Sequence, residues 1–523
     1  MIHKSPLPDV VIPEVPLTTF VFANAAGRAD KVAFVEGASG RTVTYGELLD
    51  SVQRFAGGLT AKGFGPGNVL AILAPNLPEY AVWFHGAAMT GGAVTTVNPT
   101  YTAHEVHHQL NDAGATMMVT IPMFLETAKE AAKGTSVETI YVAGEIDGGA
   151  GEGVEPVSAL YGEPRQEHAP VDLDDTVALP YSSGTTGLSK GVMLTHRNLV
   201  SNIVQTVEPA ELREDETIIA VLPFFHIYGM QVLMNCGLAV GATIVSMPRF
   251  DLEQFLQLHQ DHGVTRSFVA PPMVVALAKH PIIDNYDLSK LEQVFSGAAP
   301  LSAELAVEAG ARIDSEVVQG YGMTELSPVS HLTPSGQFKP GSVGVTAPNT
   351  ELQIIDPSTG ESLGVDLDGE VWVRGPQVMK GYLNNPTATA NTIDDDGWLH
   401  TGDIGHVDAE GHLFVVDRLK ELIKYKGFQV PPAELEALLL THPAVADAAV
   451  IGIADDEAGE IPVGFVTLKP GQEATEADII AFVAERVATY KQVRKVTFVD
   501  AIPKSASGKI LRRVLRDEAT AAG

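Results

Sequence analysis

The chain has 523 residues, which is too long for one simple hydrophobic core, so we expect two or more domains. The formal net charge is −31, which argues against binding to nucleic acid or to an anionic membrane. The apolar runs are interrupted before they reach the roughly 20 residues that a membrane span needs. No apolar leader follows Met1, and the single cysteine, Cys236, lies in an apolar segment. We therefore expect a cytoplasmic protein without disulfides, in which Cys236 is a buried core thiol.

Strand-like and helical patterns alternate along the chain up to about residue 175. Helices between strands are typical of parallel sheets, so we predict an α/β fold. The strand patterns are 31–36, 41–45, 69–74, 93–97 and 116–120, and the helical patterns are 45–62 and 78–89.

The stretch from Tyr181 to Gly191 contains three glycines, five Ser or Thr hydroxyls and one lysine. Backbone N–H groups, hydroxyls and an ammonium in one short loop form a good cradle for phosphate oxygens. A Walker loop is excluded, because the residue directly before Lys190 is not a glycine and the residue directly after it carries no hydroxyl. The structural alternative is a flexible glycine-rich surface loop.

This loop closely resembles the signature of the adenylate-forming superfamily, which includes acyl-CoA synthetases, luciferases and the adenylation domains of peptide synthetases. The resemblance implies that ATP binds here with Mg²⁺. The implied triphosphate contacts are Ser182, Ser183, Gly184, Thr185, Thr186, Gly187 and Lys190.

Residues 219–229 follow the pattern of a strand that ends at Pro223 and is followed by aromatic residues and His226. A lone histidine is more often structural than catalytic. The resemblance nevertheless implies that His226 stands as a gate between the adenylate site and the CoA channel, and that Tyr228 lies beside the acyl group.

Two later segments, 293–301 and 317–325, each follow the pattern of a strand entering a glycine-containing turn, where a planar ring can lie against bare backbone. Ordinary turn chemistry is the alternative. The resemblance implies that the second segment holds the nucleotide and its metal. In it, Gln319, Gly320, Tyr321 and Gly322 would face the base and the acid, Thr324 the α-phosphate, and Glu325 the Mg²⁺ ion.

Segment 397–403 ends in a carboxylate, Asp403, after a turn, and the alternating strand pattern at 369–375 is interpreted as structural. A turn-capping aspartate is the alternative for Asp403. The resemblance implies that its two oxygens accept hydrogen bonds from both ribose hydroxyls.

Segment 417–429 is basic, and an amphipathic surface segment is its structural alternative. The resemblance implies that Arg418 pairs with Asp403 or with the nucleotide, that Lys424 and Gln429 act in adenylate formation, and that Lys426 and Gly427 line the CoA tunnel. It also implies a large N-terminal domain of α/β subdomains plus a small β region over 1–417, a hinge at 418–420 that turns at Lys420, and a small mobile α+β domain over 421–523.

Eight basic residues lie between Lys491 and Arg516, against one acid, Asp500. This excess suggests that the C-terminal part handles an anionic ligand, although helix-surface charge is the alternative. The adenylation lysine of the family matches Lys509, whose ammonium would stabilise charge at the α-phosphate. Acetylation of Lys509 by a lysine acetyltransferase would remove that charge.

The similarity is greatest to 4-coumarate–CoA ligases, because segments 225–228, 296–300 and 423–429 all agree with them. It implies a ligase that makes an acyl-adenylate from a carboxylic acid and then a thioester with CoA. Arg249 stands where a lysine for the CoA phosphates is usual. The implied acyl pocket is Tyr228, Gln231, Phe268, Phe295, Gly297, Ala298, Gly320, Gly322, Pro328 and Val329.

Departures from the plant ligases at Gln231, Phe295 and Ser330 leave the acid open. A hydroxycinnamate is the first expectation, and a medium- or long-chain fatty acid is the alternative. Luciferase-like oxidation, loading of a carrier protein and a non-catalytic nucleotide sensor are alternatives to the CoA ligase reaction.

Overall fold

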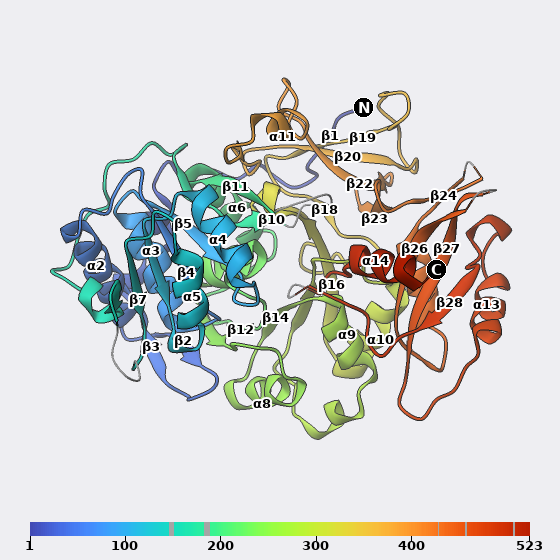
Figure 1. Cartoon of the computed structure of the whole chain (residues 1–523), viewed down its shortest axis with the longest axis horizontal. Coiled ribbons are helices and arrows are strands. Elements are labelled where there is room, and N and C mark those ends of the chain that lie inside the picture. The colour runs from blue at the N-terminus through green and yellow to red at the C-terminus, as the bar shows by residue number, and fades with distance from the viewer. Residues whose placement is uncertain (146–150, 183–188, 427, 456–457, 506–507, 523) are drawn as a thin grey trace.

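The computed structural model describes residues 1–145, 151–182, 189–426, 428–455, 458–505 and 508–522. Four β-sheets organise this part of the chain. Two nine-stranded sheets and their helices form most of the molecule, and the C-terminal part supplies all strands but β1 (His3–Lys4) of two five-stranded sheets (Figure 1).

The first nine-stranded sheet has the order β10-β11-β9-β5-β4-β6-β7-β8, with β21 paired to β11. Strands β9 to β8 in this order are parallel, and the β10–β11 hairpin is antiparallel. Its strands are β4 (Val69–Leu73), β5 (Ala93–Val97), β6 (Met117–Thr120), β7 (Thr139–Val142), β8 (Val154–Pro156), β9 (Thr176–Ala178), β10 (Tyr181–Ser182), β11 (Lys190–Thr195) and β21 (Gly381–Tyr382). β4 is buried along its whole length, as its continuous Val/Leu/Ile/Ala run requires at the centre of a parallel sheet.

The second nine-stranded sheet has the order β18-β17-β16-β15-β14-β12-β13-β2-β3. Its centre, from β16 to β2, is parallel. Its strands are β2 (Val32–Glu36), β3 (Thr42–Thr44), β12 (Thr217–Ala220), β13 (Thr243–Ser246), β14 (Arg266–Val269), β15 (Gln293–Ser296), β16 (Glu316–Gly322), β17 (Val329–Leu332) and β18 (Val345–Thr346). Together the two sheets confirm the predicted α/β fold with parallel strands.

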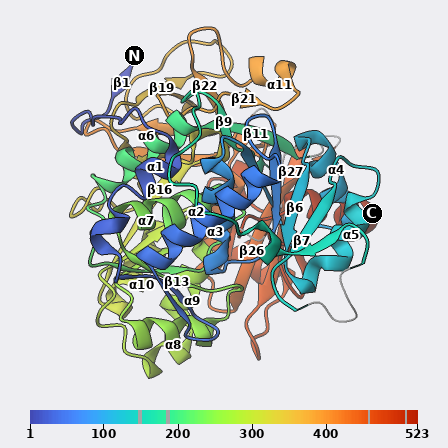
Figure 2. The same ribbon diagram turned by 90° about the vertical axis from the view of Figure 1, so that its left-hand side faces the viewer.

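Helices α2 (Tyr45–Ala61) and α3 (Pro78–Met89) lie between these two sheets, as Figure 2 shows. A capping box of Thr44 and Glu47 starts α2, and Pro78 occupies the first turn of α3. α3 contacts β4 and β5 on one side and β2 on the other, which explains why it is apolar nearly all round. The other helices of this part are α1 (Leu17–Val21), α4 (Ala103–Ala113), α5 (Leu125–Ala132), α6 (His196–Val207), α7 (Gly237–Val240), α8 (Leu252–His262), α9 (Pro271–Lys279), α10 (Ala303–Ile313) and α11 (Pro386–Ala390).

The third sheet, β1-β19-β20-β22-β23, ends at Arg418, and the chain enters the fourth sheet at Ile423. The fourth sheet has the order β25-β24-β27-β26, with β28 beside β27. The strands are β1 (His3–Lys4), β19 (Glu351–Ile355), β20 (Gly369–Arg374), β22 (Leu399–Val407), β23 (Leu413–Arg418), β24 (Ile423–Tyr425), β25 (Phe428–Val430), β26 (Val445–Asp455), β27 (Gly459–Leu468) and β28 (Lys495–Phe498); the helices are α12 (Pro432–Leu440), α13 (Glu476–Ala484) and α14 (Arg512–Ala522). The fourth sheet lies at the end of the molecule opposite α2 (Figure 1).

The apolar run after His226 forms a π-helix, η4 (Tyr228–Cys236), that continues into α7. Cys236 is fully buried, which confirms the predicted core thiol. Among the described helices, none combines the length and the apolar character required to cross a bilayer.

Most of the basic residues between Lys491 and Arg516 pair with carboxylates inside the C-terminal part, so their charge is largely neutralised there. The pairs are Lys491–Glu434, Lys504–Asp447, Arg512–Glu436, Arg513–Asp517 and Arg516–Glu421. This pairing favours the alternative in which the excess positive charge stabilises the C-terminal part rather than binding an anion. Lys509 is not a member of these pairs.

Candidate active site

The loop predicted to hold the triphosphate, residues 181–191, connects the antiparallel strands β10 and β11, and we call it the triphosphate loop. Ser182 pairs with Lys190 across its base. The Tyr181 hydroxyl donates to Asp112 on α4 at 2.7 Å and so fixes the entry to the loop. Of the predicted contacts, Ser183, Gly184, Thr185, Thr186 and Gly187 lie outside the described residues.

Lys190 is held over the ring of Tyr382, with its ammonium 3.8 Å from the ring centroid. The Tyr382 hydroxyl donates to Glu325 at 2.7 Å, and Glu325 is only 5% exposed. Burial and the nearby Lys420 ammonium lower the pKa of Lys190, whereas Glu325 acts in the opposite direction. Strand β21, which carries Tyr382, is thus the structural link between the predicted phosphate and metal residues.

The predicted ribose residue, Asp403, lies on β22 directly opposite Arg418 on β23. It accepts a hydrogen bond from the Tyr321 hydroxyl at 2.6 Å and forms an ion pair with Arg418, whose Nε lies 3.2 Å from the carboxylate. Asp403 is 5% exposed, and its charge raises the pKa of Arg418. Arg418 thus pairs with Asp403, one of the two partners expected for it, and Tyr321 contacts the same carboxylate.

Lys509 reaches this cluster from the far C-terminal segment. Its ammonium interacts electrostatically with Arg418, Asp403 and Glu325. Burial, followed by repulsion from Arg418, lowers the pKa of Lys509 to about 8. The loop that carries it packs on the start of α9, because a Cβ added at Gly508 would lie 3.2 Å from the Cβ of Ala270.

His226 lies beside Lys509, at the end of the turn that follows β12. Burial, with a contribution from the Lys509 charge, lowers the pKa of His226 to about 3, so the imidazole is neutral at physiological pH. Its Nδ1 accepts the backbone N–H of Tyr228 at 3.2 Å. We call residues 221–228 the His226 turn.

Rings and bare backbone form the predicted acyl region. The Tyr228 hydroxyl donates to the carbonyl of Phe295 at 3.2 Å, and a Cβ added at Gly297 would lie 2.9 Å from the Tyr228 ring. A Cβ added at Gly320 would lie 2.5 Å from the ring of Phe295. The absence of a side chain at these glycines therefore lets the rings of Tyr228 and Phe295 approach the backbone closely.

Other predicted acyl residues border the same strands. Phe268 on β14 lies with its ring centroid 5.7 Å from that of Phe295. A Cβ added at Gly322 would lie 2.0 Å from the Pro328 carbonyl oxygen, and the Val329 N–H donates to Asn202. Ala298, which directly follows Gly297, has a φ of 72°.

Gln231 is oriented differently from the other predicted acyl residues. It is fully buried in η4, its Nε2 donates to the carbonyl of Leu199 on α6 at 2.7 Å, and its Oε1 accepts from Asn235 at 2.9 Å. The amide therefore serves packing between η4 and α6.

Two further predicted nucleotide residues, Gln319 and Thr324, are buried. The Gln319 side chain accepts the backbone N–H of Leu301 at 3.2 Å, which ties β16 to the turn after β15.

Several predicted site residues lie on exposed positions, among them Lys424 and Gln429, which are expected to act in adenylate formation. Lys424 pairs with Gln429 across the β24–β25 hairpin. Both are exposed, as are Lys420, Lys426 and, on the large part of the molecule, Arg249. Gly427 lies outside the described residues.

Sequence reasoning missed the residues that support the site: Tyr382, Asp112 and the hydroxyl role of Tyr181. Each makes its contact with a residue distant in the chain, so no local pattern marks it. For the Tyr382 ring that lies under the Lys190 ammonium, the only signal in the sequence is a tyrosine next to a glycine at 381–382.

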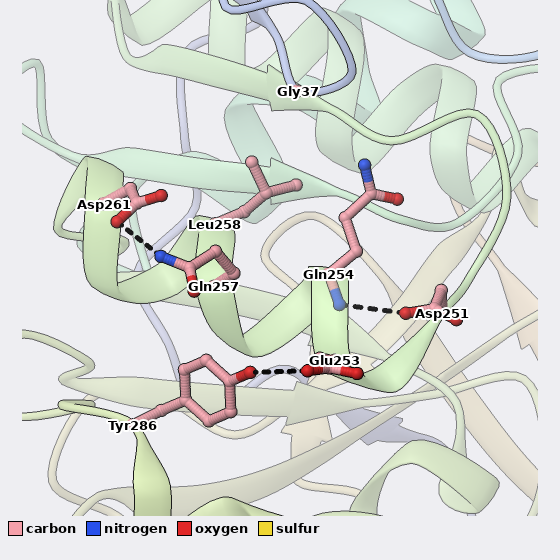
Figure 3. A pocket seen from close by; sticks show the side chains of 8 residues that line it. All are labelled: Gly37, Asp251, Glu253, Gln254, Gln257, Leu258, Asp261 and Tyr286. Atoms are coloured by element: carbon pink, nitrogen blue, oxygen red, sulfur yellow. Dashed lines mark hydrogen bonds between the residues drawn. The ribbon is translucent and has the colours of Figure 1, made fainter.

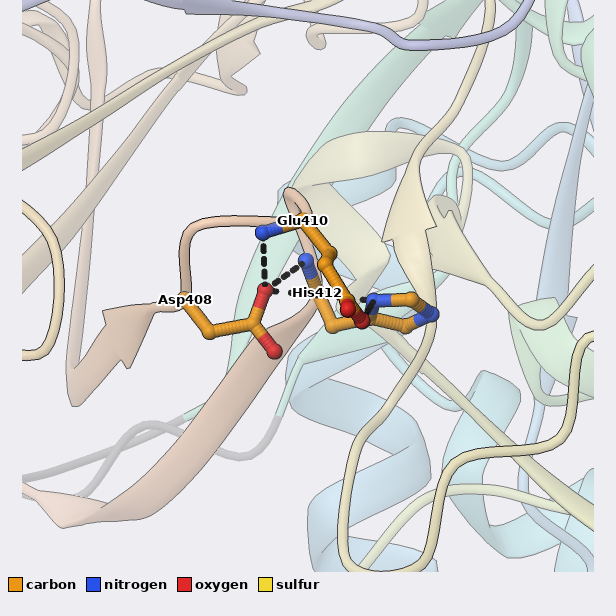
Figure 4. A group of neighbouring side chains, drawn as sticks. All are labelled: Asp408, Glu410 and His412. Atoms are coloured by element: carbon orange, nitrogen blue, oxygen red, sulfur yellow. Dashed lines mark hydrogen bonds and ion pairs between the residues drawn. The ribbon is translucent and has the colours of Figure 1, made fainter.

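Two surface features lie apart from this cluster. A hollow of about 470 Å³ beside α8 is lined by Asp251, Glu253 and Asp261, together with Tyr286 (Figure 3). At the tip of the β22–β23 hairpin, Asp408, Glu410 and His412 form a group that could hold a cation (Figure 4).

The Lys339 ammonium already bonds both carboxylates at the hairpin tip, Asp408 and Glu410. One oxygen of Asp408 also accepts the backbone N–H groups of Glu410 and His412. The group is therefore interpreted as a turn closed by an internal ion pair.

Comparisons with known proteins identify the family of this chain. Residues 21–383 match the family model described as AMP-binding enzyme, and residues 434–509 match the model of the AMP-binding enzyme C-terminal domain. 4-Coumarate–CoA ligase 3 of Oryza sativa subsp. japonica is 47% identical, covering 99% of this chain and 94% of the relative. 4-Coumarate–CoA ligase 2 of Petroselinum crispum is 44% identical over 99% of this chain and 96% of the relative.

Solved structures extend the similarity to the whole fold. The anthranilate CoA ligase AuaEII in complex with anthranoyl-AMP superposes with a TM-score of 0.91 at 28% identity, covering 98% of each chain. ATP-bound MatB from Rhodopseudomonas palustris superposes with a TM-score of 0.87 at 29% identity, covering 96% of this chain and 99% of that one. The chain therefore belongs to the AMP-binding, adenylate-forming enzyme family.

Proposed function

We propose that the protein is an AMP-forming carboxylic acid–CoA ligase whose acid is 4-coumarate or a related hydroxycinnamate. Support for the reaction comes from the convergence of Lys509 on Asp403, Glu325 and Arg418. Support for the acid comes from curated 4-coumarate–CoA ligases that are 43–47% identical over nearly the whole chain. The aromatic and glycine surfaces around Tyr228 and Phe295 suit a planar aryl ring.

In the first step, an oxygen of the substrate carboxylate attacks the α-phosphorus of ATP, the P–O bond to the β-phosphate breaks, and pyrophosphate leaves. Negative charge accumulates on the α-phosphate oxygens, where the Lys509 ammonium would stabilise it. Asp403, held by Tyr321 and Arg418, would accept hydrogen bonds from the ribose hydroxyls. Lys190 and the triphosphate loop would hold the leaving pyrophosphate.

Glu325 fits a magnesium ligand. Its carboxylate supplies the hard oxygen that Mg²⁺ prefers, and it lies near Lys190 at the base of the triphosphate loop. When bound, the ion neutralises charge on the triphosphate. Tyr382 would orient the Glu325 carboxylate through its 2.7 Å hydrogen bond.

In the second step, the CoA thiol sulfur attacks the acyl carbonyl carbon, the C–O bond to AMP breaks, and the thiol proton is lost. Lys426 and Arg249, which are expected to contact CoA, are exposed here, so this step would require residues 421–523 to turn about Lys420. Arg249, Lys426 and Gly427 would then contact CoA.

A pyrophosphate-release screen over cinnamates, benzoates and fatty acids, each with and without CoA, tests the proposal. We expect 4-coumarate to give the highest kcat/KM and to yield 4-coumaroyl-CoA only when CoA is present. A preference for fatty acids would refute the assignment of the acid. Thioester formed on a carrier protein but not on CoA would refute the assignment of the thiol.

A further inference from the structure

Two neighbouring threonines on one strand, β5, bond the backbone just before the triphosphate loop and within the His226 turn. Thr95 Oγ1 donates to the carbonyl of Leu179 at 2.9 Å, at the entry to the triphosphate loop. Thr96 Oγ1 donates to the carbonyl of Phe225 at 2.7 Å, within the His226 turn. The threonines are 0% and 2% exposed, so neither hydroxyl can exchange its bond for one to bulk water.

The geometry of a strand separates the two tasks. Consecutive strand residues point to opposite faces of the sheet, so Thr95 and Thr96 reach different partners from adjacent positions. Gln109 Nε2 donates to Thr95 Oγ1 at 2.8 Å, which leaves the hydroxyl hydrogen of Thr95 for the Leu179 carbonyl.

Asn76, in the loop between β4 and α3, adds a second attachment for the His226 turn. Its Nδ2 donates to the carbonyls of Ala220 and Leu222 at 2.9 and 2.8 Å, and its Oδ1 accepts the N–H of Phe224 at 2.7 Å. The first sheet therefore holds, through side chains, a turn that belongs to the second sheet.

We propose that Thr95 and Thr96 are positioning residues with separate tasks: Thr95 sets the triphosphate loop for ATP, and Thr96 sets the His226 turn for the acid. The His226 turn carries His226 next to Lys509 and Tyr228 against Gly297, so its displacement misplaces the carboxylic acid. The other nucleotide residues described above, Asp403 among them, come from elements that Thr96 does not touch. The inference rests on the proposed ligase function.

The experiment compares Thr95→Val with Thr96→Val, because valine keeps the shape and removes the hydroxyl. Thr120→Val is the matched control: Thr120 is 0% exposed in the same sheet and donates to the Leu73 carbonyl at 2.8 Å, away from both loops. The KM values for ATP and 4-coumarate are measured by pyrophosphate release, and ATP affinity by calorimetry without acid. Thermal unfolding of all variants monitors the common structural cost.

We expect Thr95→Val to weaken ATP binding about tenfold, the order expected for the loss of one buried hydrogen bond, and to leave the KM for 4-coumarate within about twofold. We expect Thr96→Val to give the reverse split. The Thr96→Ser variant should restore the acid KM, because serine can donate the same bond, and Thr120→Val should change neither KM.

Equal changes of both KM values in both variants, values like those of Thr120→Val, or no rescue by Thr96→Ser would overturn the proposal. Failure of the proposed function is distinguishable, because wild-type protein would then release no pyrophosphate with 4-coumarate or would form no 4-coumaroyl-CoA. The calorimetric ATP affinities of Thr95→Val and Thr120→Val would still test the task assigned to Thr95.

Discussion

The substitution Asp403→Ala tests how the nucleotide is held. One Asp403 oxygen accepts from Tyr321 at 2.6 Å and the other pairs with Arg418 at 3.2 Å, and a carboxylate oxygen can accept a second bond. Two hydrogen bonds from ribose hydroxyls to a charged acceptor are worth about 1.5–3 kcal/mol each. Their loss therefore weakens ATP binding by a factor of about 10²–10⁴. Because the freed Arg418 can turn to the phosphates, we expect the lower end.

Titration calorimetry of ATP without acid measures the effect directly. Asp403→Asn keeps one acceptor oxygen and should lose about 10–10²-fold. Asp408→Ala is the control, because Asp408 lies at the far end of the same hairpin and pairs with Lys339, so it should change stability without changing ATP affinity. An ATP affinity of Asp403→Ala within about threefold of wild type, a factor too small for the loss of even one such bond, would refute the ribose role.

Three further predictions follow from the charges and the packing. The kcat/KM for adenylation should fall as pH rises through about 8, because Lys509 loses its proton there. Lys509→Arg should remove this fall from the pH profile. If the fall persists unchanged in the arginine variant, it belongs to another group. Gly297→Val should raise the KM for 4-coumarate and leave the calorimetric ATP affinity unchanged, because the Cβ would lie 2.9 Å from the Tyr228 ring; wild-type kinetics would show that the ring moves aside. Burial raises the pKa of Glu436 from 4.5 to about 7, so its contribution to stability is full below 4.5 and lost as pH rises through 7. Arg512→Met should therefore reduce the free energy of unfolding more above pH 7 than below it, by up to about 3–5 kcal/mol. Thermal unfolding at several pH values measures this loss, and a loss independent of pH would contradict this reasoning.

Local patterns predicted the elements well where one cause dominates. The helical pattern at 78–89 matches α3 (Pro78–Met89), because Pro78 fixes its start and the run is apolar throughout. The predicted strands at 93–97 and 116–120 became β5 and β6. The strand predicted at 41–45 ends one residue earlier, because Thr44 caps helix α2 and Tyr45 begins it.

Long-range partners were beyond the sequence. Gln231 lies in a segment of the right family pattern, yet its amide bonds Leu199, a contact that depends on how η4 packs against α6. Thr95 and Thr96 carry no motif at all, since a threonine on a buried strand is ordinary until its hydroxyl partner is known. Glu436 neutralises Arg512 from 76 residues away, so the basic run appeared more available to an anion than it is.

The two half-reactions of Lys509→Ala test the central claim most directly. Adenylation is followed by pyrophosphate release, and the second step by thioester formation from supplied 4-coumaroyl-AMP and CoA. If the Lys509 ammonium stabilises the charge at the α-phosphate, the first rate should fall on the order of 10²–10³-fold while the second stays within a few-fold of wild type. Equal losses in both steps would contradict the account.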